Sequence, residues 1–128
     1  MRRLLTIPLL LGLSFSAAVE SAEYKAPQRI IATLPQYCWA QYVDGLENNP
    51  AYQIRGCHYS NHFCPGLVEI ARARTESQNW KKKELLLSAR KNMEYTLKFN
   101  KTQMPSCFLI PEAEKKIALL NIKLKAFR

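Results

Sequence analysis

Apolar residues recur at steps of three or four in four stretches of the chain, the spacing that places side chains on one face of an α-helix. The first stretch covers about residues 35–47 and starts with a proline, which suits the first helical position. The second covers residues 62–74, with Pro65 in its first turn or at a kink, because proline has no amide hydrogen to donate. The third covers about residues 80–100, and the fourth runs from near Pro111 to the end of the chain.

Each stretch carries one apolar seam, and short polar breaks separate the stretches. The seams are formed by Cys38, Tyr42 and Leu46; by Phe63, Leu67 and Ile70; by Leu86, Ala89, Met93 and Leu97; and by Ile110, Ala113, Ile117, Leu120, Leu124 and Phe127. Residues 51–60 fit neither helix nor strand, and no stretch alternates as a strand does. The pattern predicts an all-α protein of about four helices, and the short breaks favour antiparallel neighbours.

The N-terminal residues predict export from a bacterial-type cytoplasm. Arg2 and Arg3 precede an apolar run over residues 4–13, which is too short to span a membrane as a helix. Cleavage after Ala18 puts small side chains where signal peptidase requires them, whereas cleavage after Ala22 is less natural. The alternative is an N-terminal anchor that is never cut. We expect a signal peptide over residues 1–18, a lead-in over 19–33 with little pattern, and a single helical domain over 34–128.

Four cysteines indicate the chemistry of the compartment. An even cysteine count in an exported chain predicts two disulfides and therefore a periplasmic or secreted protein. A four-cysteine metal site is the rival interpretation, but no CxxC pair is present. Loss of Arg2 and Arg3 with the leader lowers the formal net charge from +9 to +7, because all ten acids remain. This excess favours anionic partners and is equally compatible with plain solubility.

Two short blocks resemble a known group of proteins. Residues 34–38 read LPQYC and resemble an LPxYC motif, and residues 62–67 read HFCPGL and resemble an HYCxGL block. Together with residues 95–97 and 108–112, these blocks resemble the N-terminal region of exported proteobacterial proteins with tetratricopeptide-type repeats. The resemblance covers roughly residues 34–120 and implies stacked TPR-like helical hairpins used for protein–protein contact. The chain ends where an array of repeats would continue, which puts a long concave peptide-binding surface in doubt.

The resemblance also implies a disulfide pairing. Cys38 and Cys64 lie inside the two similar blocks, so the favoured bonds are Cys38–Cys64 and Cys57–Cys107. If residues 57–64 form one helix, the Cα atoms of Cys57 and Cys64 lie about 10 Å apart, too far for a disulfide. A Cys57–Cys64 bridge would instead mean that this stretch is not helical.

The histidines, His58 and His62, are the low-probability candidates for a metal or haem site. If residues 57–64 are helical, the two rings lie one turn apart on one face, a spacing that can bind copper, zinc or a haem iron. The order is not CxxCH, no glutamate lies between them as in HExxH, and no third ligand is evident. The favoured interpretation is structural: His62 frames a disulfide and packs on Tyr59 or Trp39, and we expect no cofactor.

Catalytic motifs are absent from the sequence. It contains no GxSxG, no P-loop and no glycine-rich nucleotide turn, and paired cysteines offer no thiolate nucleophile. We therefore expect a protein that is not an enzyme. Trp80 beside Lys81, Lys82 and Lys83 forms an aromatic and basic edge of the kind found at interfaces. A polyanion or anionic-lipid binder is thus an alternative function, although genomic nucleic acid is largely absent outside the cytoplasm.

The last stretch carries more apolar surface than one seam needs. Leu119 and Ile122 lie beside the seam, and in a repeat scaffold a following helix would cover them. We expect them to form an exposed contact patch, with a polar rim that favours an acidic partner. The rim residues are Lys115, Lys116, Lys123 and Lys125. Alternatively, the helices close into a bundle that buries both flanks.

These features together predict a non-enzymatic periplasmic interaction or scaffold module that docks on another envelope protein, with a second copy of the chain and peripheral membrane contact as further options. A metal- or haem-binding protein using His58 and His62 is the first alternative.

Overall fold

The computed structural model describes residue 12 and residues 22–127, and within this part every regular element is helical. The expected signal peptide lies outside the described residues, apart from Gly12. The elements, in chain order, are α1 (Gln28–Ile31), the 3-10 helices η1 (Gln36–Gln41) and η2 (Pro50–Tyr52), α2 (Phe63–Thr75), α3 (Asn79–Gln103), α4 (Leu109–Leu124) and the 3-10 helix η3 (Lys125–Phe127). The all-α class is therefore confirmed for the described residues.

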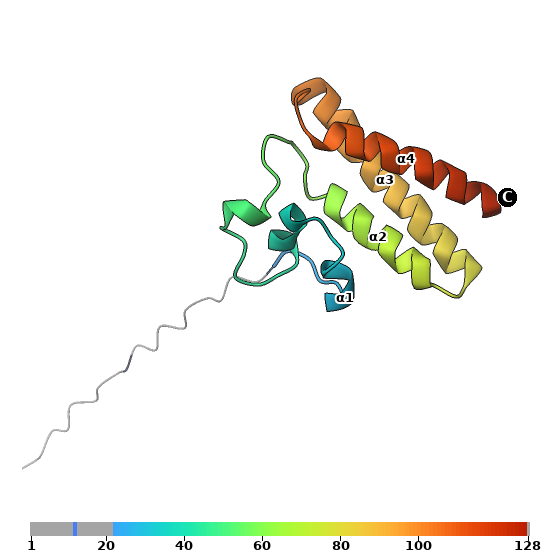
Figure 1. Cartoon of the computed structure of the whole chain (residues 1–128), viewed down its shortest axis with the longest axis horizontal. Coiled ribbons are helices and arrows are strands. Elements are labelled where there is room, and N and C mark those ends of the chain that lie inside the picture. The colour runs from blue at the N-terminus through green and yellow to red at the C-terminus, as the bar shows by residue number, and fades with distance from the viewer. Residues whose placement is uncertain (1–11, 13–21, 128) are drawn as a thin grey trace, which may run out of the picture.

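The three long helices α2, α3 and α4 lie side by side and form the body of the domain (Figure 1). The central helix α3 packs against both neighbours. Its seam of Leu86, Ala89 and Met93 is at most 2% exposed. The last helix contributes Ala113 and Leu120 to the same core, both fully or nearly fully buried. The sequence seams thus identify the side of each long helix that faces the core, since apolar burial is the main favourable contribution to folding.

Gly66 allows α2 and α3 to approach closely. A Cβ atom at this position would lie 2.8 Å from Cε of Met93 and 3.2 Å from Cβ of Asn92. Both distances are shorter than ordinary packing contacts, so an added Cβ would displace the end of the Met93 side chain and require Asn92 to shift by a few tenths of an ångström. The glycine of the HFCPGL block therefore has a packing role in the crossing of the two helices.

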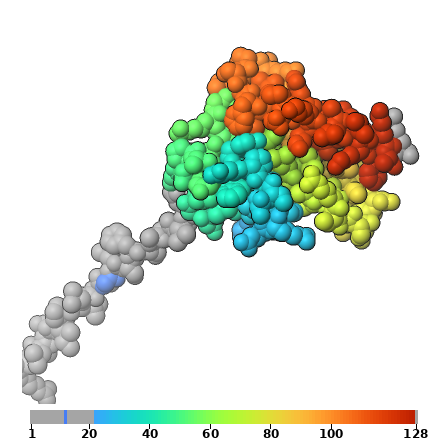
Figure 2. All heavy atoms as spheres, viewed as in Figure 1, coloured from blue at the N-terminus to red at the C-terminus, as the bar shows by residue number. Residues whose placement is uncertain are grey.

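The N-terminal part of the domain packs against α2 as one continuous mass (Figures 1 and 2). Residues 19–33 were expected to be a lead-in with little pattern, but within them α1 contributes Ile30, which is 6% exposed, to the common core. The amide of Tyr24 donates to the carbonyl of Gln41 at 2.9 Å, and the Tyr24 and Tyr42 rings lie 5.8 Å apart. These contacts join the segment to the folded domain.

The expected helix over residues 35–47 is wrong in type and length. The segment forms the 3-10 helix η1 only to Gln41, and the following Tyr42 has φ of −126°, outside the helical range. Gly45 then takes a positive φ of 87°, a left-handed conformation that glycine adopts without steric cost. The i,i+4 spacing of Cys38, Tyr42 and Leu46 was real, but tertiary contacts of Cys38 and Tyr42 explain their burial without a long helix.

Two disulfides connect these parts, and no described cysteine is free. Cys38–Cys64 joins η1 to the first turn of α2, and Cys57–Cys107 joins the segment before α2 to the α3–α4 loop. These are the bonds that the resemblance favours. They indicate an oxidising compartment outside the cytoplasm.

Candidate interaction surface

The outer side of α4 carries a strip of exposed apolar side chains. Leu119 is 51% exposed and Ile122 is 63% exposed, although both are large aliphatic residues. Ala118 is exposed beside them, and the spacing places all three on one side of the helix. We call Ala118, Leu119 and Ile122 the α4 strip. The opposite side of the helix buries Ala113 and Leu120, so the strip has no partner within the described chain.

The lysines of α4 do not all border this strip. Lys115, Lys123 and Lys125 are exposed, and Lys115 forms a surface ion pair with Glu112 at 3.6 Å. Lys116 instead lines a hollow between α2 and the segment that precedes η1, together with Glu112 and Arg74. Three of the four lysines named for the rim are thus exposed, whereas Lys116 faces the hollow beside α2.

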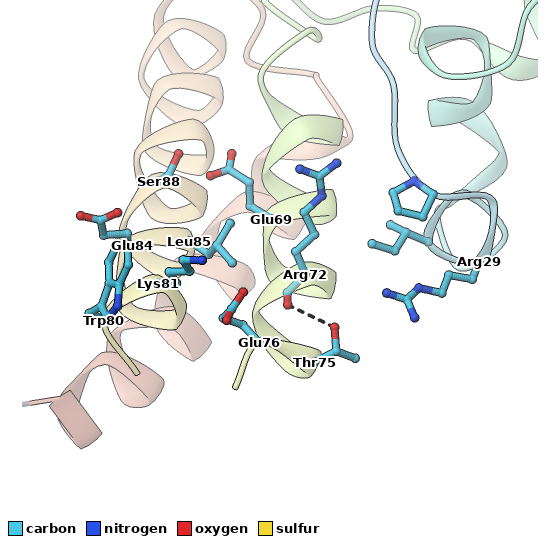
Figure 3. A pocket seen from close by; sticks show the side chains of 12 residues that line it. Arg29, Glu69, Arg72, Thr75, Glu76, Trp80, Lys81, Glu84, Leu85 and Ser88 are labelled. Atoms are coloured by element: carbon cyan, nitrogen blue, oxygen red, sulfur yellow. Dashed lines mark hydrogen bonds between the residues drawn. The ribbon is translucent and has the colours of Figure 1, made fainter. Parts of the chain in front are cut away.

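Trp80 lies away from the α4 strip, at the start of α3. Its side chain is 60% exposed and borders a groove of about 770 Å³ between α1, α2 and α3 (Figure 3). Arg29 of α1 and Arg72 of α2 lie on the walls of this groove, and Glu69 lies between Arg72 and Ser88. The groove thus combines both signs of charge with one large aromatic side chain.

Glu69 is part of a polar chain that crosses the α2–α3 interface. Burial raises the pKa of this carboxyl, while hydrogen bonds from Ser88 and Asn92 and the nearby Arg72 guanidinium oppose the rise. The amide nitrogen of Asn92 donates to Oε1 of Glu69, and Oδ1 of Asn92 lies 3.0 Å from Nδ1 of His62. Asn92 therefore bridges a carboxyl and an imidazole in a partly buried position, which fixes the side chain of His62.

The two candidate metal ligands lie in different environments. Residues 53–62 are not helical and α2 begins at Phe63, so the histidines do not share a helix face. His58 is exposed, whereas His62 is half-buried, with its ring centroid 4.0 Å from that of Tyr95. Among the described residues no group of three or more His, Cys, Asp or Glu side chains is arranged to hold a metal ion. His62 contacts Tyr95, whereas the sequence interpretation named Tyr59 or Trp39.

A cluster of aromatic rings covers the junction between the 57–62 segment and α3, and the sequence pattern did not predict it. The Tyr59 ring lies 4.5 Å from Phe99 and 5.5 Å from Tyr95, and Tyr95 lies 4.7 Å from Phe99. Tyr59 has a positive φ of 53°, a conformation that non-glycine residues rarely adopt. The only sequence signal was the i,i+4 spacing of Tyr95 and Phe99, which joins no apolar seam.

Asn100 holds this segment in place. Its side chain is fully buried, and it binds both backbone groups of His58: Oδ1 accepts from the His58 amide at 2.8 Å, and Nδ2 donates to the His58 carbonyl at 2.9 Å. Nδ2 also donates to the Thr96 carbonyl at 2.7 Å. Together with the Cys57–Cys107 bond, these contacts make the segment a fixed part of the surface. An asparagine near the end of an amphipathic stretch gives no sequence signal for such a role.

Comparison of the chain with protein-family models, with curated proteins and with solved structures finds no match. The resemblance to exported tetratricopeptide-type proteins therefore stays a hypothesis. Among residues 22–127, none of the helices combines the length and apolar character that crossing a bilayer requires.

Proposed function

We propose that this protein is a non-enzymatic interaction module of the cell envelope that docks on an acidic partner protein through the α4 strip. The single observation that carries the proposal is the exposure of Leu119 and Ile122, at 51% and 63%, on a helix whose other side is buried. Contiguous exposed apolar surface of this kind usually marks a protein contact. We further propose that α2–α3 and α3–α4 form antiparallel hairpins of the tetratricopeptide type and that the protein works in the periplasm.

The charges around the strip favour an acidic partner. Lys115 and Lys123 are exposed on α4 and Lys125 on the adjoining η3, and complementary charge across an interface speeds association and selects the partner. A second copy of this chain is less suitable, because pairing two α4 strips would bring these lysines towards one another. The formal net charge, +7 once Arg2 and Arg3 are lost with the expected leader, adds a long-range repulsion between copies at low salt.

The scaffold beneath the strip suits a docking role because it is fixed before binding. The strip lies on a 16-residue helix that packs on α3, and Nη1 of Arg90 donates to Oδ1 of Asn121 at 2.9 Å beside it. Nζ of Lys101 lies 3.0 Å from the Glu114 carboxylate and adds a second link between the two helices. A preformed surface loses little conformational entropy when it binds, which improves affinity.

The test is a double substitution in the strip, Leu119→Asp with Ile122→Asp. A photo-crosslinking residue placed at Ala118 in the native host first identifies the partner, and binding of the purified pair is then measured at low and high salt. We expect a partner with an acidic contact surface, weaker binding at high salt, and at least a 100-fold loss of affinity in the double variant, since hot-spot truncations cost about 2 kcal/mol or more each.

The control is Leu87→Asp, which introduces one negative charge, half of that in the double variant, at another exposed leucine, on α3. The control should bind as the unchanged protein does, and both variants should keep the helical circular dichroism signal. Three results would contradict the proposal: unfolding of the double variant, which would mean that these side chains are core; undiminished binding; or self-association that the double variant abolishes, which would identify a second copy as the occupant.

A further inference from the structure

One end of the helix layer gathers cations from three helices that are far apart in sequence. At this end α2 stops, α3 begins and α4 passes into η3 (Figure 1). We call this region the basic end. Its cations are Arg74 of α2; Lys81, Lys82 and Lys83 of α3; Lys123 of α4; and Lys125 of η3. The sequence shows the lysine run of residues 81–83, but only the fold adds the cations of the other two helices to it.

The convergence of the three helices is visible in a hollow that they share. Arg74, Lys82 and Lys123 all line one depression of about 390 Å³, with Leu86 and Phe127 as part of its apolar lining. Like charges brought together in this way repel one another, and the fold holds them there without neutralising them. An external anion is therefore the natural counter-charge for this end.

None of the six cations forms an ion pair with another described residue. The ion pairs within residues 22–127 are Arg90–Glu94, Lys101–Glu114 and Lys115–Glu112, which all lie outside this set of cations. Glu76 and Glu84 lie close to the lysine run in the sequence, and Glu112 shares a hollow with Arg74, so the cations of the basic end outnumber the acids near them. Oε1 of Glu76 accepts a hydrogen bond from the Gln78 amide and thereby closes the α2–α3 turn.

Trp80 adds an apolar anchor to this charge. It lies in the first turn of α3, its side chain is 60% exposed, and Nζ of Lys81 lies 5.4 Å from the centre of its ring (Figure 3). Exposed tryptophan is costly in water, but the indole ring with its N–H group is well suited to the headgroup region of a bilayer. The other tryptophan, Trp39, is different: it stacks on Tyr52 and donates to the Leu34 carbonyl.

We propose that the basic end binds the surface of an anionic phospholipid bilayer, with Trp80 in the headgroup region and the lysines against the lipid phosphates. Five of the six cations are lysines, which act as flexible point charges, whereas a stereospecific anion site usually employs arginine forks. Lys81 lies against the exposed Trp80 ring, and the other cations come from the same end of the helix layer. That arrangement fits a flat, diffuse negative surface better than a discrete ligand.

The experiment measures partitioning of the purified exported protein, without the expected leader, onto vesicles of phosphatidylcholine alone and of phosphatidylcholine mixed with phosphatidylglycerol in equal parts. We expect binding only to the anionic vesicles, a decrease with salt, and a blue shift of tryptophan emission. The shift should disappear in Trp80→Phe, since Trp39 is already packed. Replacing Lys81, Lys82 and Lys83 with glutamine should weaken partitioning roughly 100-fold, because each cation near an anionic surface contributes about a factor of five.

The matched control replaces Lys25, Arg55 and Lys98 with glutamine. These residues are exposed, lie outside the basic end and give the same change in net charge. An equal loss of binding in the control would overturn the proposal in favour of net charge alone. Binding to anionic vesicles without any emission shift, or binding to soluble polyphosphate as tight as to vesicles, would overturn it in favour of a general polyanion site. All substitutions leave the α4 strip unchanged, so this result is independent of the proposed docking function.

Discussion

Asn100 offers a direct test of how the 57–62 segment is held, through the substitution Asn100→Ala. The change removes two hydrogen bonds to the backbone of His58, at 2.8 and 2.9 Å, and leaves a small cavity at a fully buried position. Each bond contributes about 1 kcal/mol, and the lost side-chain packing adds about 1 kcal/mol more. We therefore expect the free energy of unfolding to fall by roughly 3 kcal/mol.

A second substitution, Asn100→Asp, separates hydrogen bonding from volume. The carboxylate can still accept from the His58 amide, but it cannot donate to the carbonyls of His58 and Thr96, which would then face a buried negative charge. This variant should be less stable than Asn100→Ala at neutral pH, because an uncompensated buried charge costs more than a missing side chain. The difference in the free energy of unfolding between the two variants should become smaller in acid, where the introduced carboxyl is protonated.

Urea unfolding followed by circular dichroism gives the stability, and hydrogen exchange of the His58 amide gives the local effect. Thr102→Ala is the control: its hydroxyl is exposed on the same helix and donates only to carbonyls of the preceding turn, so its loss should stay within about 0.5 kcal/mol. If Asn100→Ala matches this control and the His58 amide stays protected, the disulfide alone holds the segment and the reasoning is wrong.

Three further predictions concern the packing and charge of the domain. Replacing both Cys57 and Cys107 with alanine opens a loop with a sequence separation of 50 residues, and urea unfolding should show a loss of about 4 kcal/mol. The substitution Gly66→Ala would place a Cβ atom 2.8 Å from Cε of Met93. We expect thermal unfolding to show a decrease of about 1 to 2 kcal/mol in the free energy of unfolding, after the better helix propensity of alanine is included. Burial raises the pKa of Glu69, so the folded state binds this proton more tightly than the unfolded state, and the contribution of Glu69 to stability is present in acid and lost as pH rises through the raised pKa. Glu69→Gln should therefore gain stability relative to the unchanged protein between pH 4 and pH 7, and a constant difference in melting temperature over that range would refute the assignment.

Local pattern alone was sufficient for the long helices. The seams that run through Phe63, Met93 and Leu120 predicted α2, α3 and α4, and most of the predicted helix ends lie within a few residues of the observed ones. The reason is that burial of one helix face requires a three-to-four spacing of apolar residues in the sequence. The exposure of Leu119 and Ile122 could also be anticipated, since they lie beside a seam that is already complete.

The N-terminal half was decided by tertiary contacts that no local spacing records. The i,i+4 spacing of Cys38 and Tyr42 suggested a helix over residues 35–47, but the regular structure ends with η1 at Gln41. Both residues are instead buried by contact with other segments. Ile30 gives no periodic signal in a four-residue helix, yet it packs into the core. Here the position of each residue depends on its distant neighbours, and helix periodicity is informative only where a helix is long enough to repeat.

For the candidate surfaces, too, some features follow from the sequence and others only from the tertiary structure. The sequence by itself determined the composition of the lysine run at residues 81–83 and the apolar excess of α4, because each belongs to one continuous helix. Only the tertiary structure brought Arg74 and Lys123 to the same hollow as Lys82, linked His62 through Asn92 to Glu69, and fixed the backbone of His58 on Asn100. The physical reason is that helix crossings and disulfides set distances between residues tens of positions apart, whereas sequence periodicity fixes only the face of a single helix.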